Sequence, residues 1–378
     1  MWLKWGSKSV EKAAVISSHR KKILTVALIA AAATASPLVG PLQAAHAAGQ
    51  TIYVSPAGND SGSRILAAKQ PVATITRAIR LAQPGDTIIV RGGTYVGAAG
   101  YGATPGRREA PIRLQNAPGE RVVIKGTLQL ENADYWRVSG INVTQNPGGP
   151  RKEFLVKFDG GTGWQFVRSE VWGTKGVSNL MISGSAKNGS PKDYRVADNC
   201  IHDNNATGDA FMNDHNIYLM PGYHSGPGVI EHNLLFNAEN GAAIKAAGPT
   251  AATGAARVTI RRNTVARTAA GVIIGYGSNR IQIRDNLIGQ QVKRPPAGAK
   301  YVSNYNAAMI GNHVNGAANI SVSTGIWGFP RSLNQTGDST RPIRAAYTTW
   351  LDPDFDNTSS CSGFHPSDPK ARRYGRFS

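Results

Sequence analysis

A six-residue frame, apolar-x-x-Asn-x-aliphatic, recurs through the middle of the chain and limits the folds open to it. The clearest copies begin at Val196, Ile230, Ile260 and Ile283, and weaker copies, with Ile141 and Ser169 in the Asn place, begin at Val138 and Phe166. Successive copies start 28, 30, 34, 30 and 23 residues apart. Repeats of this length are typical of a solenoid, in which each repeat forms one coil and buries its apolar side against its neighbours.

The frame suits stacked parallel strands. Alternating apolar residues can point into a narrow core whose rungs lie about 4.8 Å apart. Asn at a bend tolerates left-handed backbone angles, and its amide can bond to the next Asn in a ladder, so we interpret these residues as structural. A leucine-rich horseshoe would need a Leu-x-x-Leu-x-Leu signature, and a propeller would need blade motifs of roughly 40 residues. Neither pattern is present, and the sequence predicts an all-β parallel β-helix.

The block from Ala73 to Tyr95 predicts a helix followed by a strand. An apolar stripe at i, i+3, i+4 and i+7 consists of Ile75, Ala78, Ile79 and Ala82. Pro84-Gly85 ends this helix, and the β-forming run Thr87–Val90 follows. Together with an earlier strand at Thr51–Val54, the block resembles the N-terminal cap of secreted right-handed parallel β-helix proteins of the pectate-lyase-like superfamily.

This resemblance implies a single-stranded right-handed parallel β-helix of the kind used by polysaccharide lyases, uronan epimerases and some glycoside hydrolases. We expect a strand and helix cap over residues 48–95 and coils over 96–318. The regularity fades from about residue 290, so residues 319–378 are predicted to form an irregular C-terminal tail that covers the end of the helix or lies along its side.

Residues 1–47 have the pattern of a cleaved export signal. A basic region ends at Arg20-Lys21-Lys22, an Ala-rich apolar stretch follows, and Ala45-His46-Ala47 supplies a cleavage site. The alternative is a membrane anchor, but Pro37 interrupts the apolar run before the ~20 residues that a span needs. We therefore expect a secreted, monomeric protein with no membrane span after cleavage.

Charge indicates the partner. Six of the 42 Lys and Arg residues and one of the 23 Asp and Glu residues lie in the leader, which leaves 36 against 22 and a net charge of +14. A basic exported protein suits an acidic polysaccharide, and no nucleic-acid motif is present. The alternative is that the charge serves solubility alone. The two cysteines, Cys200 and Cys361, could form a disulfide, or Cys200 could be a buried small apolar residue.

Candidate site residues lie in two successive coils. If Ile217 and Leu219 face inward, the side chains of the intervening polar positions face outward. Aligning Ile217 with Ile244 in the next coil places Tyr218 and Lys245 one rung apart on the same face. The predicted outward residues near them are Asp214, Asn216, Tyr218, Met220 and Lys245, with Tyr276 beside Gly275 one coil further on.

This grouping suits β-elimination from a uronic acid, which needs a cation at the C6 carboxylate, a base near C5 and an acid for the departing oxygen. Lys245 is the base if cationic neighbours lower its pKa, or else the carboxylate clamp. Tyr218 or His215 then acts as base or acid. The candidate substrate contacts are Asp214, Asn216, Tyr276, Arg261, Arg284 and His224.

The run Asn240–Gly248 also looks like the strand that carries the base lysine in one pectate-lyase family of this fold. In that family, clustered aspartates upstream hold calcium that bridges the substrate carboxylate. Here the upstream aspartates, Asp198, Asp203, Asp209 and Asp214, are dispersed with no adjacent pair. Asp209 and Asp214 are the weak metal candidates, and Ca²⁺ is the one cofactor that the resemblance suggests.

Other functions stay open at this point. A C5-epimerase would use the same proton abstraction, and a hydrolase would need two carboxylates about 5 to 9.5 Å apart, for which Asp209 with Asp214 or Asp214 with Glu239 are the candidates. A non-catalytic glycan-binding β-helix would keep Lys245 as a solvated charge and Tyr218 as a stacking surface. His215 shares the inward direction of Ile217 and could simply be a buried histidine.

Overall fold

A computed structural model gives the fold of the chain. It describes residues 49–67, 69–149, 153–204, 214–222, 225–247, 254–275, 278–289, 306–310, 321–327, 333–335, 344–350, 355–356 and 359–376. The chain divides into two units, residues 1–46 and 47–378, and the fold described below is that of the second. The predicted leader at residues 1–47 lies outside the described residues. Within them, no helix has the length and apolar character needed to cross a membrane.

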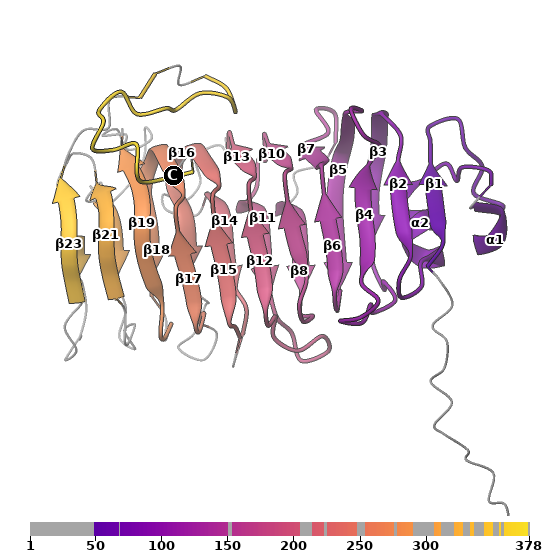
Figure 1. Cartoon of the computed structure of the whole chain (residues 1–378), viewed down its shortest axis with the longest axis horizontal. Helices are drawn as coiled ribbons and strands as arrows, with labels where there is room; N and C mark the ends of the chain where they lie inside the picture. Colours follow the sequence, from indigo (N-terminus) through magenta and orange to yellow (C-terminus); the bar gives the residue numbers. More distant parts are fainter. Residues whose placement is uncertain are drawn as a thin grey trace, which may run out of the picture. The chain divides into compact units, whose positions relative to one another are not determined.

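The described strands between residues 51 and 350 form coils and pair in parallel with those of the coils before and after (Figure 1). The first sheet contains β1 (Thr51–Val54), β2 (Thr87–Val90), β4 (Ile112–Asn116), β6 (Trp136–Ser139), β9 (Gln165–Val167), β12 (Tyr194–Ala197), β15 (Gly228–Glu231) and β17 (Val258–Arg261). The second contains β7 (Ile141–Thr144), β10 (Glu170–Trp172) and β13 (Cys200–His202). The third contains β8 (Phe154–Asp159), β11 (Ser178–Ser183), β14 (His215–Met220), β20 (Asn306–Ile310) and β22 (Leu333–Gln335).

Long strands turn the corner between sheets. Those that run from the second sheet into the third are β3 (Gly93–Gly100), β5 (Val122–Glu131), β16 (Leu234–Ala246) and β18 (Thr264–Ile274). Those that run from the first into the second are β19 (Gln282–Gly289), β21 (Ser321–Trp327) and β23 (Arg344–Trp350). The coils therefore continue to Trp350, past residue 318, where the sequence predicted their end. The all-β solenoid is confirmed, whereas the right-handed sense of the coil stays a prediction.

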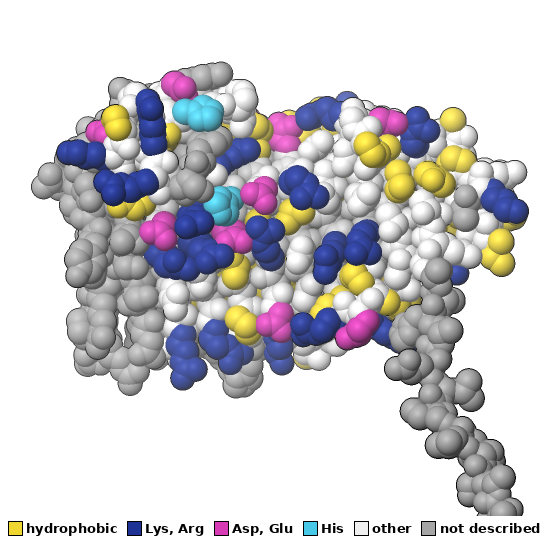
Figure 2. Space-filling model, viewed as in Figure 1, with side chains coloured by type: hydrophobic (Ala, Val, Ile, Leu, Met, Phe, Trp, Pro, Cys, Tyr) yellow, Lys and Arg dark blue, Asp and Glu magenta, His cyan; other side chains and the backbone are white. Residues whose placement is uncertain are grey.

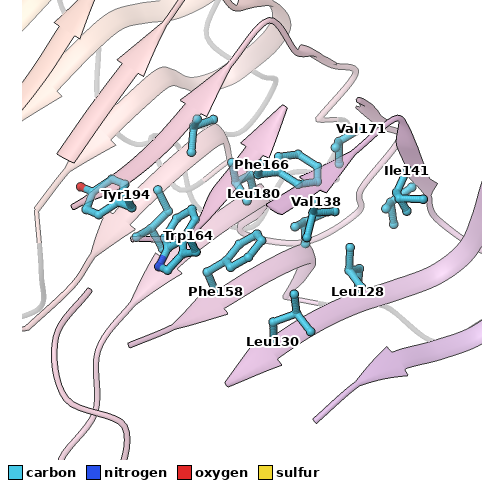
Figure 3. Close-up of a cluster of buried hydrophobic side chains, with 14 of the residues drawn as sticks. Leu128, Leu130, Val138, Ile141, Phe158, Trp164, Phe166, Val171, Leu180 and Tyr194 are labelled. Atoms are coloured by element: carbon cyan, nitrogen blue, oxygen red, sulfur yellow. The ribbon is translucent and has the colours of Figure 1, made fainter. Parts of the chain in front are cut away.

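The first residue of the repeated frame forms one column of the core. In-register pairing stacks fully buried side chains along the first sheet: Ile52, Ile88, Leu114, Val138, Phe166, Val196, Ile230, Ile260 and Ile283. Aromatic rings fill the wider coils, with Trp164 stacked between Phe158 and Tyr194 at centroid distances of 4.1 and 5.0 Å (Figure 3). The inward direction predicted for the apolar positions of the frame is therefore confirmed.

The Asn positions form the predicted ladder at the corner between the first and second sheets. The Nδ2 groups of Asn199, Asn233 and Asn263 each donate to the Oδ1 of the next Asn at 3.0 Å. The last acceptor in this ladder is Asn286. Ser169 takes the Asn place one coil earlier, and its backbone N–H donates to Asn199 Oδ1 at 3.0 Å. All of these side chains are buried, so each amide replaces the water that a bend would otherwise need.

The sequence suggested that the ladder Asn itself has the left-handed backbone conformation, and this is wrong. In each coil the left-handed residue is the one before the ladder position: Asp198, His232, Arg262 and Asp285, with φ of 59°, 54°, 52° and 57°. The left-handed residue turns the chain and directs its own side chain outward. The Asn that follows can then point its amide into the stack, where the next rung lies within hydrogen-bonding distance.

We expect Asn233→Ala to lower the free energy of unfolding by about 3 kcal/mol, because buried donors and acceptors in the two neighbouring rungs lose their partner. Urea unfolding followed by circular dichroism measures the change. Gln282→Ala, an exposed position on the outer side of the first sheet, is the matched control. Equal midpoints for the two variants would show that the ladder adds no stability.

The helix and strand predicted between Ala73 and Tyr95 are α2 (Ile75–Leu81) and β2, and a shorter helix, α1 (Arg64–Ala67), precedes them. Thr74 caps α2 by accepting the Arg77 N–H at 3.1 Å. The apolar stripe of α2 is buried in the same core cluster as β1, β2 and β3. The helix thus packs against side chains of the first coils.

The C-terminal segment, residues 355–356 and 359–376, lies along the outer side of the second sheet. Cys361 forms a disulfide with Cys200 of β13, 161 residues away in the chain. The Phe364 ring packs 4.6 Å from the Phe236 ring, and the Arg376 N–H donates to Thr264 Oγ1 at 3.0 Å. A second apolar cluster, separate from the core, therefore joins this segment to the coils (the end of the chain marked C in Figure 1).

We expect the double variant Cys200→Ala/Cys361→Ala to lose about 3–5 kcal/mol of unfolding free energy, because the disulfide closes a long loop. Urea unfolding measures the loss, and limited proteolysis should locate new cleavage in residues 355–376. Wild-type protein treated with a reductant should behave like the double variant. Unchanged stability and protease resistance would mean that the apolar cluster alone holds the segment.

Candidate active site

The outer surface of the third sheet carries a column of side chains set by the strand register. Pairing of β5, β8, β11, β14, β16 and β18 stacks Gln129, Lys157, Met181, Tyr218, Lys245 and Ile273 in this order. Ile217 pairs with Ile244, and Tyr218 pairs with Lys245. The predicted alignment of these two coils is therefore confirmed, and we call this set of residues the outer column.

Lys245 and Tyr218 are in contact within the outer column. Both are half-buried, and Lys245 Nζ lies 5.0 Å from the centroid of the Tyr218 ring. Burial lowers the pKa of Lys245 to about 8. The predicted cause of such a shift was cationic neighbours, whereas the cause in the structure is desolvation of the ammonium group. A substantial fraction of Lys245 is therefore a neutral amine in mildly alkaline solution.

His215 lies beneath this surface. Its ring is fully buried, its Nδ1 accepts the Ala242 N–H at 3.0 Å, and its centroid lies 5.4 Å from the Tyr218 ring. A ring with no exposed surface does not touch a sugar on the outer face. The structure therefore does not support direct proton transfer by His215, and places this side chain where it positions Tyr218.

The outward direction predicted for Asn216 and Asp214 is wrong. Asn216 is fully buried, and its amide accepts from Asn179 at 3.1 Å and donates to the Phe236 carbonyl at 3.0 Å. Asp214 is 3% exposed and accepts from Asn240 at 2.8 Å. Asp214 directly precedes β14 and Asn216 is the second residue of that strand, where its amide bonds to the Phe236 carbonyl of the second sheet and does not follow the alternation.

Arg261 and Arg284 do not belong to the surface that carries Lys245. Both lie in the first sheet, where Arg261 and Arg195 pair with Glu231 and Arg284 lies 3.4 Å from Asp285. Burial by itself raises the pKa of Glu231, but its two arginine partners outweigh burial and hold the pKa below its usual value. Figure 2 shows Lys and Arg side chains spread over the visible face with Asp and Glu between them. These two arginines, predicted as substrate contacts, therefore lie on a different sheet from Lys245.

Three predicted residues, Tyr276, His224 and Asp209, lie outside the described residues and stay predictions. The carboxylates that the structure describes form no group of three that could hold a metal ion. The one cluster of potential ligands there is Cys200, His202 and Cys361, and its two sulfurs are joined in the disulfide. The described residues thus do not fit a calcium site.

His202 belongs to the packing of the second sheet. Its ring stacks between Trp172 and Phe236, and its nitrogens lie 2.9 Å from Asp203 Oδ2 and 3.2 Å from Glu170 Oε1. Burial by itself lowers the pKa of His202, but the two carboxylates outweigh burial and raise it. This histidine therefore joins neighbouring rungs and is covered by the C-terminal segment.

Sequence reasoning missed Lys157. It lies in the outer column with its Nζ 5.3 Å from the Phe154 ring. The alternation of Val156 and Phe158 indicates that Lys157 faces outward. Its coil lacks the Asn of the frame, however, so the sequence offers no register that would align it with Lys245.

Comparisons with known proteins agree with this architecture. No family model matches the chain. Over 119 residues it is 30% identical to pectate lyase PEL9 of Emericella nidulans, a match that covers 26% of this chain and only 28% of that enzyme. In fold it is similar to the complex of XylC with xylose, with a TM-score of 0.57 and 13% identity over 80% of this chain and 70% of that one. A glycoside hydrolase gives a TM-score of 0.51 and 9% identity over 86% and 99% of the two chains. The predicted resemblance to parallel β-helix proteins of the pectate-lyase-like superfamily is thus confirmed.

We expect Lys245 to react with a limiting amount of an amine-specific reagent at unusually low pH. Its labelling should reach half of the limiting rate near pH 8, because only the neutral amine reacts, whereas an ordinary lysine does so near pH 10.4. Mass spectrometry of peptides after labelling from pH 6 to 11 measures this. The exposed Lys125 serves as the internal reference. A midpoint near pH 10 for Lys245 would contradict the assignment.

Proposed function

We propose that this protein is an exported polysaccharide lyase that cleaves an acidic, uronate-containing glycan by β-elimination at the outer column. The observation that carries the proposal is the pair formed by Tyr218 and Lys245, in which burial lowers the pKa of the amine to about 8. An amine with this pKa is a competent base near neutral pH, since the efficiency of a general base is greatest when its pKa is close to the working pH.

In this reaction the neutral Lys245 amine takes the proton from C5 of the uronate. The electron pair of the C5–H bond forms the C4–C5 double bond while the bond from C4 to the glycosidic oxygen breaks. The departing oxygen takes a proton, which we assign to the Tyr218 hydroxyl, one rung away. The resulting Lys245 ammonium lies over the Tyr218 ring, where a cation–π contact stabilises it by about 0.5–2 kcal/mol.

The substrate class follows from charge. After removal of the predicted leader the chain has a net charge of +14, which attracts a polyanion. Calcium held by carboxylates would be a further way to neutralise the substrate. The described carboxylates do not group around one point, so the proposed reaction has no calcium step.

The handedness of the coil, its N-terminal cap and the export of the protein belong to the same proposal. We expect a right-handed coil, α2 as its N-terminal cap, and residues 1–47 as a leader removed on export. The contact of α2 with the first coils supports the cap, and the composition of residues 1–47 supports export.

Hydrolysis is the weaker enzyme reaction for this site. It needs two carboxylates facing one glycosidic bond, and Asp214 is a member of both candidate pairs. Asp214 is buried and accepts a hydrogen bond from Asn240, so it does not face the outer surface. An epimerase would share the abstraction by Lys245 and differ only in returning a proton to C5.

We expect wild-type protein to release unsaturated uronates from pectate, alginate or a glycosaminoglycan, and Lys245→Ala to be slower by about 10²–10⁴-fold. Lys245→Arg should be equally impaired, because a guanidinium group keeps the charge but stays protonated. The wild-type rate should rise with pH through about 8, since the ammonium form below that pH cannot accept a proton. The ultraviolet absorbance of the unsaturated uronates measures the rates of the wild type and of both variants, and Lys125→Ala is the control.

Each alternative has its own outcome. Full activity in Lys245→Arg would make Lys245 a carboxylate clamp and not the base. Release of reducing ends without absorbance would indicate a hydrolase, and hydrogen exchange at C5 without cleavage would indicate an epimerase. Binding of acidic glycans with none of these reactions would indicate a non-catalytic binding protein.

A further inference from the structure

The two cysteines and His202 form a compact group of potential metal ligands on the second sheet. The Sγ atoms of Cys200 and Cys361 and a ring nitrogen of His202 all lie within 4.8 Å of one another. Cys200 and His202 are buried, and Cys361 is half-buried. In the disulfide the two sulfurs carry no charge to offer a cation. Once reduced and deprotonated, they are thiolates, the ligands that favour zinc over calcium.

A fourth potential ligand, Glu170, lies beside this group. It pairs in register with Cys200, and its Oε1 lies 3.6 Å from Cys361 Sγ and 3.2 Å from His202 Nε2. Ligands on one tetrahedral zinc ion are separated by about 3.6 Å for sulfur and oxygen and about 3.4 Å for nitrogen and oxygen. The two measured distances are therefore close to the edges of a zinc tetrahedron. The other carboxylate oxygen, Oε2, is held by Arg121 at 2.6 Å, which fixes the orientation of the group.

The His202 ring already has the orientation that a zinc ligand needs. It is held between the rings of Trp172 and Phe236, at centroid distances of 6.2 and 4.6 Å. Its Nδ1 lies 2.9 Å from Asp203 Oδ2. A histidine that binds a metal through one ring nitrogen almost always donates its other N–H to a carboxylate or carbonyl, which fixes the tautomer. Asp203 thus leaves the lone pair on Nε2, the nitrogen that lies beside Glu170.

Contacts other than the disulfide keep Cys361 near these ligands. The Phe364 ring packs 4.6 Å from the Phe236 ring. The Arg376 guanidinium donates to the Cys361 carbonyl at 3.1 Å, and the Arg376 N–H donates to Thr264 Oγ1 at 3.0 Å. Breaking the S–S bond therefore leaves the C-terminal segment against the second sheet. There the sulfurs can separate to the distance of about 3.8 Å that two thiolates on one zinc ion require.

We infer that the reduced protein binds one Zn²⁺ ion through Cys200, Cys361 and His202, so that zinc and the disulfide are alternative links between the C-terminal segment and the coils. Glu170 supplies the fourth ligand. Reduction by a dithiol breaks the S–S bond: the dithiol closes to its own disulfide and gives two electrons and two protons to the cysteine sulfurs. Zn²⁺ then replaces these protons, which pass to water. The site lies on the second sheet, away from the outer column, so it does not depend on the proposed reaction.

Cobalt is the probe for this site, because tetrahedral Co²⁺ with thiolate ligands absorbs visible and ultraviolet light and Zn²⁺ does not. The full chain is reduced with a phosphine, which becomes its oxide and competes less for the metal than a dithiol does. We expect the reduced protein to bind one Co²⁺ per chain with a thiolate-to-cobalt charge-transfer band. Zn²⁺ should displace the cobalt and abolish the band. The oxidised protein should bind neither ion.

Asp203→Asn distinguishes a built metal site from thiols that bind metal unaided, because it leaves both cysteines in place. Asn tolerates the left-handed backbone at this position, where φ is 53°, but its amide lacks the charge that orients the His202 ring. We expect zinc affinity to fall about 10–100-fold. Asp193→Asn, at an exposed left-handed position with φ of 51°, is the matched control and should leave the affinity unchanged.

Limited proteolysis reports the structural consequence. Zinc should protect residues 355–376 of the reduced protein as the disulfide does, and a chelator should remove this protection. The inference is overturned if the reduced protein shows no charge-transfer band, or if Asp203→Asn and Asp193→Asn bind zinc equally well. Equal zinc affinity in the Cys200→Ala/Cys361→Ala variant would likewise overturn it, because the metal would then bind elsewhere. None of these results bears on the release of unsaturated uronates by Lys245.

Discussion

Hydrogen bonding between identical rungs is the constraint on which the rest of this structure depends. Parallel pairing in register forces each coil to repeat the position of the one before, about 4.8 Å along the axis. The buried column from Ile52 to Ile283 and the ladder from Asn199 to Asn286 are both consequences of this translation. A core of this kind tolerates insertions at the corners, because a loop between two strands leaves the register of both unchanged.

The same translation builds the candidate site. Lys245 and Tyr218 are 27 residues apart in the chain, yet they are adjacent because their strands share a register. The lowered pKa of Lys245 comes from its half-buried position on the sheet and does not require another cation. A solenoid can therefore lower the pKa of an amine by packing alone, and it can set a second lysine, Lys157, at a whole number of rungs from the first.

The accuracy of prediction from sequence followed the strength of the repeat. The inward column, the Asn ladder and the alignment of Ile217 with Ile244 were all predictable, because each depends on a residue type that recurs at one place in the coil. Asn216 and Asp214 were assigned to the wrong direction because the alternation rule takes no account of side-chain hydrogen bonds at the start of a strand: Asp214 directly precedes β14, and Asn216 is its second residue. Arg261 and Arg284 were predicted as substrate contacts together with residues near Lys245. The outward direction of a side chain does not by itself identify which of the three sheets carries the residue.

The sequence by itself determined the class of fold, since a frame repeated every 23 to 34 residues with buried amides at the bend is compatible with little else. It also determined which two coils carry Tyr218 and Lys245. The tertiary structure decided how corners, sheets and tail are arranged: that the disulfide joins Cys200 to Cys361, that His215 lies under Tyr218, and that Lys157 shares a column with Lys245. These features depend on contacts between residues 3 to 161 apart, and the local residue pattern does not contain the turn angles that bring such residues together.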